Sequence, residues 1–131
     1  MSDAGETFFT AVGCMDGRVQ DPIAEFGRKK FNVLFADTIT EAGLVGLLEA
    51  NDTGSLIGES IKKKLLISVG KHHSKGIIVH GHQECAGNPV EDGLHKDHVK
   101  KAAEFIKTLV DVLVIPVFVK RGENGWEVEE L

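Results

Sequence analysis

The sequence predicts an α/β fold in three layers: a mostly parallel sheet of order 2-1-3-4, a C-terminal antiparallel strand added to it, and helices on both faces. Short apolar runs alternate along the chain with segments whose apolar residues recur at helical spacing. The runs are apolar throughout, which is typical of parallel strands buried on both faces. With right-handed crossovers, 2-1-3-4 is then the simplest strand order.

The first half of the chain contains two of the expected strands. Residues 8–12 form the first strand, which Gly13 closes. Asp21 and Pro22 predict the start of a helix that runs to about Lys30, with aspartate as the N-cap and proline at the first helical position. Residues 31–36 form the second strand, and 37–43 a loop. Whether residues 44–50 form a short helix stays open.

The second half begins with a stripe of apolar residues at every fourth position, which predicts a helix from Ser55 to about Ser74: Ile57, Ile61, Leu65 and Val69. The third strand starts at Gly76, and residues 99–110 carry another helical face. Residues 112–119 form the fourth strand. Because Pro116 cannot donate to a ladder, we expect a bulge or an edge there. Residues 121–125 form a turn, and 126–130 the antiparallel strand.

Composition and charge exclude several kinds of partner. The 131 residues are 42% hydrophobic and 27% charged, which is typical of a globular protein. We expect a single domain over 1–131, in which the small polar residues 1–6 are disordered. A net charge of -5 argues against nucleic acid or an anionic membrane surface as a partner. The longest apolar run is too short to span a bilayer, and no signal-like segment opens the chain. We therefore expect a cytoplasmic protein.

Metal-competent side chains follow two of the predicted strands. Cys14 ends the first strand, and His82 and Cys85 follow the third. In the order 2-1-3-4 these strands are neighbours, and their carboxyl ends flank the switch point at which such sheets bind ligands. Thiolate and imidazole are good zinc ligands, and three protein ligands leave a fourth position open for catalysis. We therefore expect Zn²⁺ as cofactor, and hydration or hydrolysis of a small electrophile as the reaction class.

Two charged residues follow Cys14 across a predicted turn. Asp16 and Arg18 can form a bidentate pair that holds the carboxylate off the metal and aims it at the bound water. If this pair breaks, Asp16 becomes the fourth ligand, and the protein is a non-catalytic zinc-binding module with a closed site. Two other interpretations of Cys14 and Cys85 stay open: inert buried thiols, and a redox pair, which a reducing cytoplasm disfavours.

The remaining histidines have simpler interpretations. His80 alternates with His82 along the strand end, and it either supports the metal site or is a core histidine bonded to a backbone carbonyl. The other four are expected to be solvated on helix surfaces or ends: His72, His73, His95 and His98.

Two short motifs resemble those of the β-class carbonic anhydrases, and in particular their small, divergent members. The segment from Cys14 to Arg18 matches the C-x-D-x-R motif, and the segment from His82 to Cys85 matches H-x-x-C. The resemblance implies that these two cysteines and this histidine bind zinc, and that Asp16 and Arg18 orient the zinc-bound water. It also implies an α/β fold, a homodimer or higher homo-oligomer with its active site near the subunit interface, and reversible hydration of carbon dioxide to bicarbonate.

One segment departs from that family's pattern. Residues 40–43 read Thr-Glu-Ala-Gly where typical members carry Arg-Asn-Ala-Gly. A lost arginine and a gained glutamate make the pocket rim less positive, which is unfavourable for bicarbonate. Related members use the same zinc hydroxide on carbon disulfide or carbonyl sulfide, so hydrolysis of such a CO2-like molecule is the alternative reaction.

Overall fold

The computed structural model describes residues 5–50 and 56–131. Within them, five strands form one sheet: β1 (Phe8–Gly13), β2 (Phe35–Thr40), β3 (Gly76–His82), β4 (Leu113–Gly122) and β5 (Gly125–Glu130). Their order is β2-β1-β3-β4-β5, with the first four strands parallel and β5 antiparallel to β4. The predicted strand order and the predicted antiparallel strand are confirmed.

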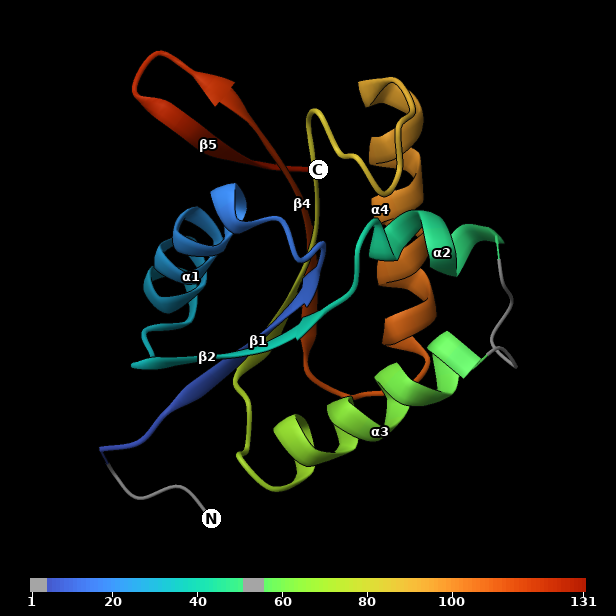
Figure 1. Ribbon diagram of the computed structural model, residues 1–131. Helices are drawn as coiled ribbons and strands as arrows, with labels where there is room; N and C mark the ends of the chain where they lie inside the picture. The colour runs from blue at the N-terminus through green and yellow to red at the C-terminus, as the bar shows by residue number, and fades with distance from the viewer. Residues whose placement is uncertain (1–4, 51–55) are drawn as a thin grey trace.

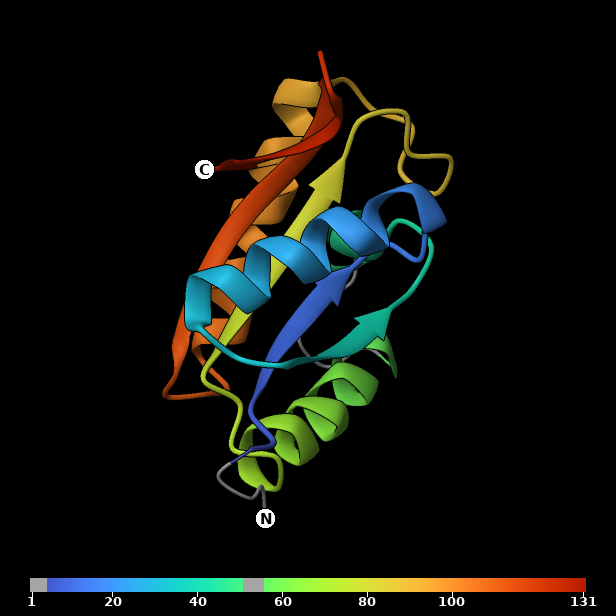
Figure 2. The same cartoon turned by 90° about the vertical axis from the view of Figure 1, so that its left-hand side faces the viewer.

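Helices cover both faces of this sheet, as predicted. Helix α1 (Gly17–Phe31) lies alone on one face, and α2 (Leu44–Ala50), α3 (Leu56–Gly70) and α4 (Asp92–Lys107) lie on the other (Figure 1). Figure 2 looks onto the first face, where α1 crosses in front of the strands. Each face has its own cluster of buried apolar side chains, one containing Phe9 and Ile23 and the other Val12 and Leu65. None of the described helices is long and apolar enough to cross a membrane.

Helix α1 begins at Gly17, so the predicted start at Asp21 was wrong. The carboxylate of Asp16 caps the helix by accepting a hydrogen bond from the backbone N–H of Arg18 at 2.9 Å. Pro22 lies inside the helix, where its ring nitrogen cannot donate to the preceding turn. The cap at Asp16 thus sets the start, one turn before the Asp-Pro pair that the sequence pattern favoured.

Strand β2 begins at Phe35, so the predicted strand over 31–36 was wrong by four residues at its start. Helix α1 continues to Phe31 because the ring of this residue packs against Gly76, where an added Cβ would lie 2.2 Å from it. Asn32 then ends the helix in the left-handed conformation, with its N–H bonded to the Arg28 carbonyl. The first part of the predicted loop, residues 37–40, consequently forms most of β2.

The remaining helices differ from the predictions mainly at their ends. Residues 44–50 form the short helix that the sequence pattern neither predicted nor excluded. Helix α3 ends at Gly70 instead of Ser74, and α4 runs from Asp92 to Lys107 instead of 99–110. The predicted helix start at Ser55, and most of the disorder expected for residues 1–6, lie outside the described residues.

Pro116 causes neither a bulge nor an edge, so that prediction was wrong. The register between β3 and β4 runs unbroken past the Val79–Pro116 pair, and β4 lies between β3 and β5. The Pro116 carbonyl accepts from the N–H of Leu131 at 3.0 Å. Because the nitrogen and the carbonyl of one strand residue point to the same side, the missing N–H faces away from β3. Strand β4 extends to Gly122, three residues beyond the predicted end.

His80 is a core histidine. It is fully buried opposite Gly13 of β1, where an added Cβ would lie 2.4 Å from its ring. Burial, followed by the nearby charge of His82, lowers the pKa of His80 to about 3, so that it stays neutral. Neither ring nitrogen has a hydrogen-bond partner among the described residues, so the expected bond to a backbone carbonyl is not formed.

His95 is also buried, and the prediction of a solvated side chain was wrong. It is 2% exposed, packed at 5.5 Å from the ring of Phe118 and against Gly81, where an added Cβ would lie 2.7 Å from its Nε2. Burial, followed by the charges of His82 and His98, lowers the pKa of His95 to about 4. A charged imidazole is therefore disfavoured in the folded state.

The buried glycine of α1 gives a first prediction. An added Cβ at Gly27 would lie 2.1 Å from the Phe9 ring, and both residues are buried. We expect Gly27→Ala to lower the free energy of unfolding by about 1 to 3 kcal/mol, because overpacking outweighs the better helix propensity of alanine. Gly70→Ala is the matched control, since apart from the adjacent residues and the nearby backbone of its own helix, no described atom lies within 4 Å of its added Cβ. Urea denaturation of both variants decides; equal stabilities would contradict the packing account.

His95 gives a prediction for pH. Its pKa falls from 6.5 to about 4 on folding, so the unfolded chain binds a proton that the folded chain does not. The contribution of His95 to the free energy of unfolding is therefore complete above pH 6.5. It is lost as the pH falls toward 4, by at most about 1.4 kcal/mol per pH unit. Removing the imidazole in His95→Leu should therefore flatten the acid side of the stability curve, measured by urea denaturation at several pH values. A difference between variant and parent that does not change with pH would show the expectation to be wrong.

Candidate metal centre

The carboxyl ends of β1 and β3 bring three donor side chains together. Cys14 directly follows β1, His82 is the last residue of β3, and Cys85 lies in the loop after it. All three are buried, and their ligand atoms lie within 4.8 Å of one another. A set of two thiols and one imidazole in this arrangement can hold a metal ion.

The imidazole of His82 has one nitrogen engaged and one free. Its Nδ1 lies 2.7 Å from the backbone carbonyl of Gln83, and since a carbonyl only accepts, Nδ1 carries the proton. Nε2, which keeps its lone pair in the neutral ring, is buried without a hydrogen-bond partner among the described residues. Metal-binding histidines are usually oriented in this way, by a bond from the other ring nitrogen to a carboxylate, a backbone carbonyl or a water. His82 is thus arranged to bind a metal ion through Nε2.

The two cysteines are free, with their Sγ atoms 3.8 Å apart. Burial opposes ionisation of Cys14, but the imidazole of His82 and the N–H of Gly43, 3.4 Å from the sulfur, lower its pKa to about 7. Burial, followed by the charge on Cys14, raises the pKa of Cys85. The site therefore accepts one negative charge readily, and the second thiolate requires a cation beside it.

The carboxylate of Asp16 lies between the three donors and the guanidinium of Arg18. Its Oδ2 lies 3.8 Å from Nε2 of His82 and accepts from Nη2 of Arg18 at 2.8 Å. Its Oδ1 accepts from Nε of Arg18 at 3.1 Å, which completes a bidentate pair. The hydrogen bonds from Arg18 lower the pKa of Asp16 to about 2. The carboxylate is therefore ionised and fixed beside the three donors.

Three residues next to this pair were not indicated by the sequence pattern: Glu84, Arg121 and Trp126. Arg121 donates to Glu84 at 2.7 and 3.0 Å, and the ion pair lowers the pKa of this carboxyl. Arg121 also lies over the indole of Trp126. The β-hairpin pairs these two residues across the strands, and a two-residue turn between apolar runs is the signal that would have placed them together. Their reach to Arg18 depends on sheet twist, which no local pattern specifies.

The segment that departs from the expected Arg-Asn-Ala-Gly pattern lies directly beside Cys14. The N–H of Glu41 donates to the Gly13 carbonyl at 3.2 Å, while its side chain is exposed. Gly43 has a φ of 61°, and an added Cβ would lie 2.3 Å from the Gly87 carbonyl oxygen. Only glycine fits this close approach, which aims the Gly43 N–H at the Cys14 sulfur. The backbone of this segment therefore supports the metal group, although its arginine is absent.

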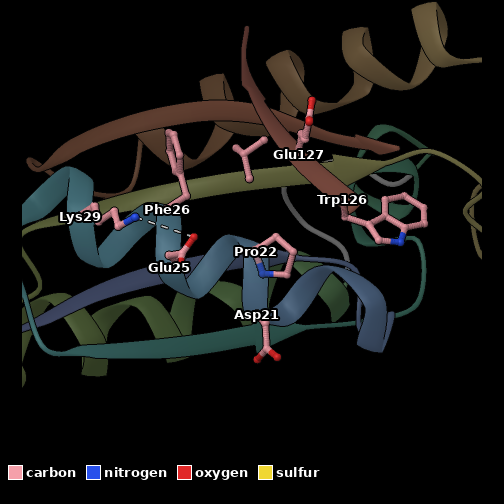
Figure 3. A pocket seen from close by; sticks show the side chains of 8 residues that line it. Asp21, Pro22, Glu25, Phe26, Lys29, Trp126 and Glu127 are labelled. Atoms are coloured by element: carbon pink, nitrogen blue, oxygen red, sulfur yellow. Dashed lines mark ion pairs between the residues drawn. The ribbon is translucent and has the colours of Figure 1, made fainter. Parts of the chain in front are cut away.

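A groove of about 550 Å³ lies next to this centre, between α1 and β5 (Figure 3). Figure 3 shows Trp126 at one end of the groove and the Glu25–Lys29 ion pair toward the other. Its lining comes from both elements: Asp21, Pro22, Glu25, Phe26, Lys29, Trp126, Glu127 and Val128. Trp126 is thus shared between the groove and the surroundings of Arg18.

Comparison with known proteins places the chain in a family. A family model described as "Putative carbonic anhydrase" matches residues 4–131, and a search of curated proteins found no match. The matched region includes both motif segments and all the residues that converge at the carboxyl ends of β1 and β3. The chain belongs to this carbonic anhydrase family.

Proposed function

We propose that the protein binds Zn²⁺ through Cys14, His82 and Cys85 and catalyses the reversible hydration of carbon dioxide to bicarbonate. The observation that carries the proposal is the buried group of three donors with an unpartnered Nε2. Two sulfurs on one tetrahedral zinc ion, each at about 2.3 Å, lie about 3.8 Å apart. The Sγ–Sγ distance of 3.8 Å therefore fits zinc. Zinc in a three-ligand site supplies hydroxide near neutral pH.

Asp16 and Arg18 have distinct parts in this proposal. The carboxylate of Asp16 stays ionised and acts as a hydrogen-bond acceptor that orients the attacking water. Arg18 uses two N–H groups on the two carboxylate oxygens and so keeps Asp16 from turning toward the metal. The alternative, a closed non-catalytic zinc module, has one supporting observation: Oδ2 of Asp16 is already 3.8 Å from Nε2 of His82. We favour the open site because the bidentate pair and the cap on α1 both hold Asp16 back.

We also propose that the protein is a homodimer. Strand β2 is an edge of the sheet. Its first residue, Phe35, is 45% exposed, and Leu34 directly before it is 57% exposed. An exposed apolar edge strand favours pairing with a second copy of the chain. The expected partners of the chain are therefore a small-molecule substrate and one further subunit.

Stopped-flow measurement of carbon dioxide hydration by zinc-loaded protein tests the proposed reaction. We expect a rate above buffer that disappears when the metal is removed by a chelator and returns when zinc is added back. Carbon disulfide and carbonyl sulfide, linear like carbon dioxide, are tested in parallel as the alternative substrates. No hydration above buffer at neutral and at alkaline pH would remove the proposed reaction.

The pair between Asp16 and Arg18 gives a prediction for activity. We expect Arg18→Gln to lower kcat/KM for carbon dioxide by about 10- to 100-fold, the usual effect of removing a residue that orients a metal site. Arg28→Gln is the matched control, since Arg28 is an exposed arginine in the last turn of the same helix. An Arg18→Gln variant as active as the control would show that the pair has no part in catalysis.

A further inference from the structure

Arg18 has more partners than Asp16. Its Nη1 donates to Oε1 of Glu84 at 3.2 Å, and its Nη2 donates to the Glu84 backbone carbonyl at 3.2 Å. The guanidinium also lies 4.9 Å from the centroid of the Trp126 ring, a distance at which cation–π attraction is appreciable. Glu84 thus offers Arg18 a second carboxylate beside the one that the proposed mechanism uses.

Glu84 is itself occupied by a second arginine. Arg121 donates through Nε to Oε2 at 2.7 Å and through Nη2 to Oε1 at 3.0 Å, both shorter than the contacts from Arg18. The Arg121 guanidinium lies 4.6 Å from the centroid of the same Trp126 ring. The two arginines and two carboxylates therefore form one neutral network in which Glu84 is the shared acceptor.

The backbone fixes both ends of this network. Glu84 has a φ of 58°, in the left-handed region that residues other than glycine seldom adopt. The N–H of Arg121 donates to Oε1 of Gln83 at 2.8 Å, and Nε2 of Gln83 donates to Asp92 at 2.8 Å. The start of α4, the loop after β3 and the end of β4 are thus tied together around the carboxylate of Glu84.

We propose that Arg121 is a positioning residue of the metal centre: by holding the Glu84 carboxylate, it leaves Arg18 free to keep Asp16 off the metal. The inference rests on the proposed function, because it concerns the open and closed states of that site. Glu84 and Asp16 share the single guanidinium of Arg18, Glu84 through Nη1 and Asp16 through Nε and Nη2, so a stronger hold by one carboxylate weakens the hold of the other. Loss of Arg121 frees Glu84 to draw Arg18 away, whereas loss of the Glu84 charge leaves Arg18 to Asp16 alone.

The two residues therefore have opposite effects, although they form one ion pair. Arg121→Gln should favour Asp16 on the metal and close the site. Glu84→Gln should favour the pair between Asp16 and Arg18 and open the site. In the double variant the competing carboxylate is gone, so it should behave like Glu84→Gln. If the pair had only a structural role, both single variants would damage the site in the same direction.

Azide binding to the cobalt-substituted protein, followed by visible absorption at neutral pH, tests this inference without measuring activity. Azide needs the open metal position, so its affinity reports how often Asp16 is off the metal. We expect Arg121→Gln to weaken azide binding by about two- to three-fold, as for a changed exposed ion pair. Glu84→Gln should strengthen it by less than two-fold, because a site that is already mostly open can gain little affinity by opening further. Circular dichroism of each variant establishes that it is folded.

Azide is an anion, so a simple change of local charge must be separated from the effect on Asp16. Both shifts should disappear in an Asp16→Asn background, where no carboxylate can close the site; shifts that persist there would overturn the inference. Lys120→Gln, which removes a charge one residue away on β4, should leave azide affinity unchanged. Shifts of the two single variants in the same direction would also overturn it.

The result can be read separately from the proposed reaction. Opposite, Asp16-dependent shifts in a protein that does not hydrate carbon dioxide would remove the reaction and support the positioning role. Hydration together with parallel shifts would support the reaction and remove the positioning role.

Discussion

The parallel pairing of β1 with β3 is the constraint on which the candidate metal centre depends. The register that sets Gly13 opposite His80 brings the carboxyl ends of the two strands level. Cys14 then leaves one strand while His82 ends the other, and their ligand atoms meet with that of Cys85. The absence of a side chain at Gly13 leaves room for the buried His80 ring. A slip of one residue would turn every side chain of a strand to the opposite face and separate the donors.

Asp16 joins the local structure of the chain to the chemistry of the site. Its carboxylate caps α1, pairs with Arg18 and faces Nε2 of His82. The same hydrogen bond therefore sets both the start of the helix and the position of the carboxylate. The hairpin of β4 and β5 also contacts this arginine, because the guanidinium groups of Arg18 and Arg121 both lie over the Trp126 ring. Elements far apart in sequence thus act on one guanidinium.

The sequence was informative wherever a property depended on chain-wide pattern. Apolar runs without alternation predicted the parallel sheet and its order, and the order alone predicted that Cys14 and His82 would lie at neighbouring strand ends. It was less informative where a tertiary contact decided the outcome. Because Phe31 packs on Gly76, β2 starts later in the chain than predicted, and because Asp16 caps α1, this helix starts earlier. Contact with Phe118 accompanies the burial of His95. The network around Glu84 also depends on sheet twist, which no local motif encodes.

The central claim is that two cysteines and one histidine hold a zinc ion whose fourth position is open. X-ray absorption at the zinc edge of the loaded protein tests it most directly. We expect two sulfur ligands at about 2.3 Å, one imidazole nitrogen at about 2.0 Å and one light atom from solvent, unchanged in Asp16→Asn. A shell without sulfur, or a fourth ligand whose bond length or absorption edge changes in Asp16→Asn, would contradict it.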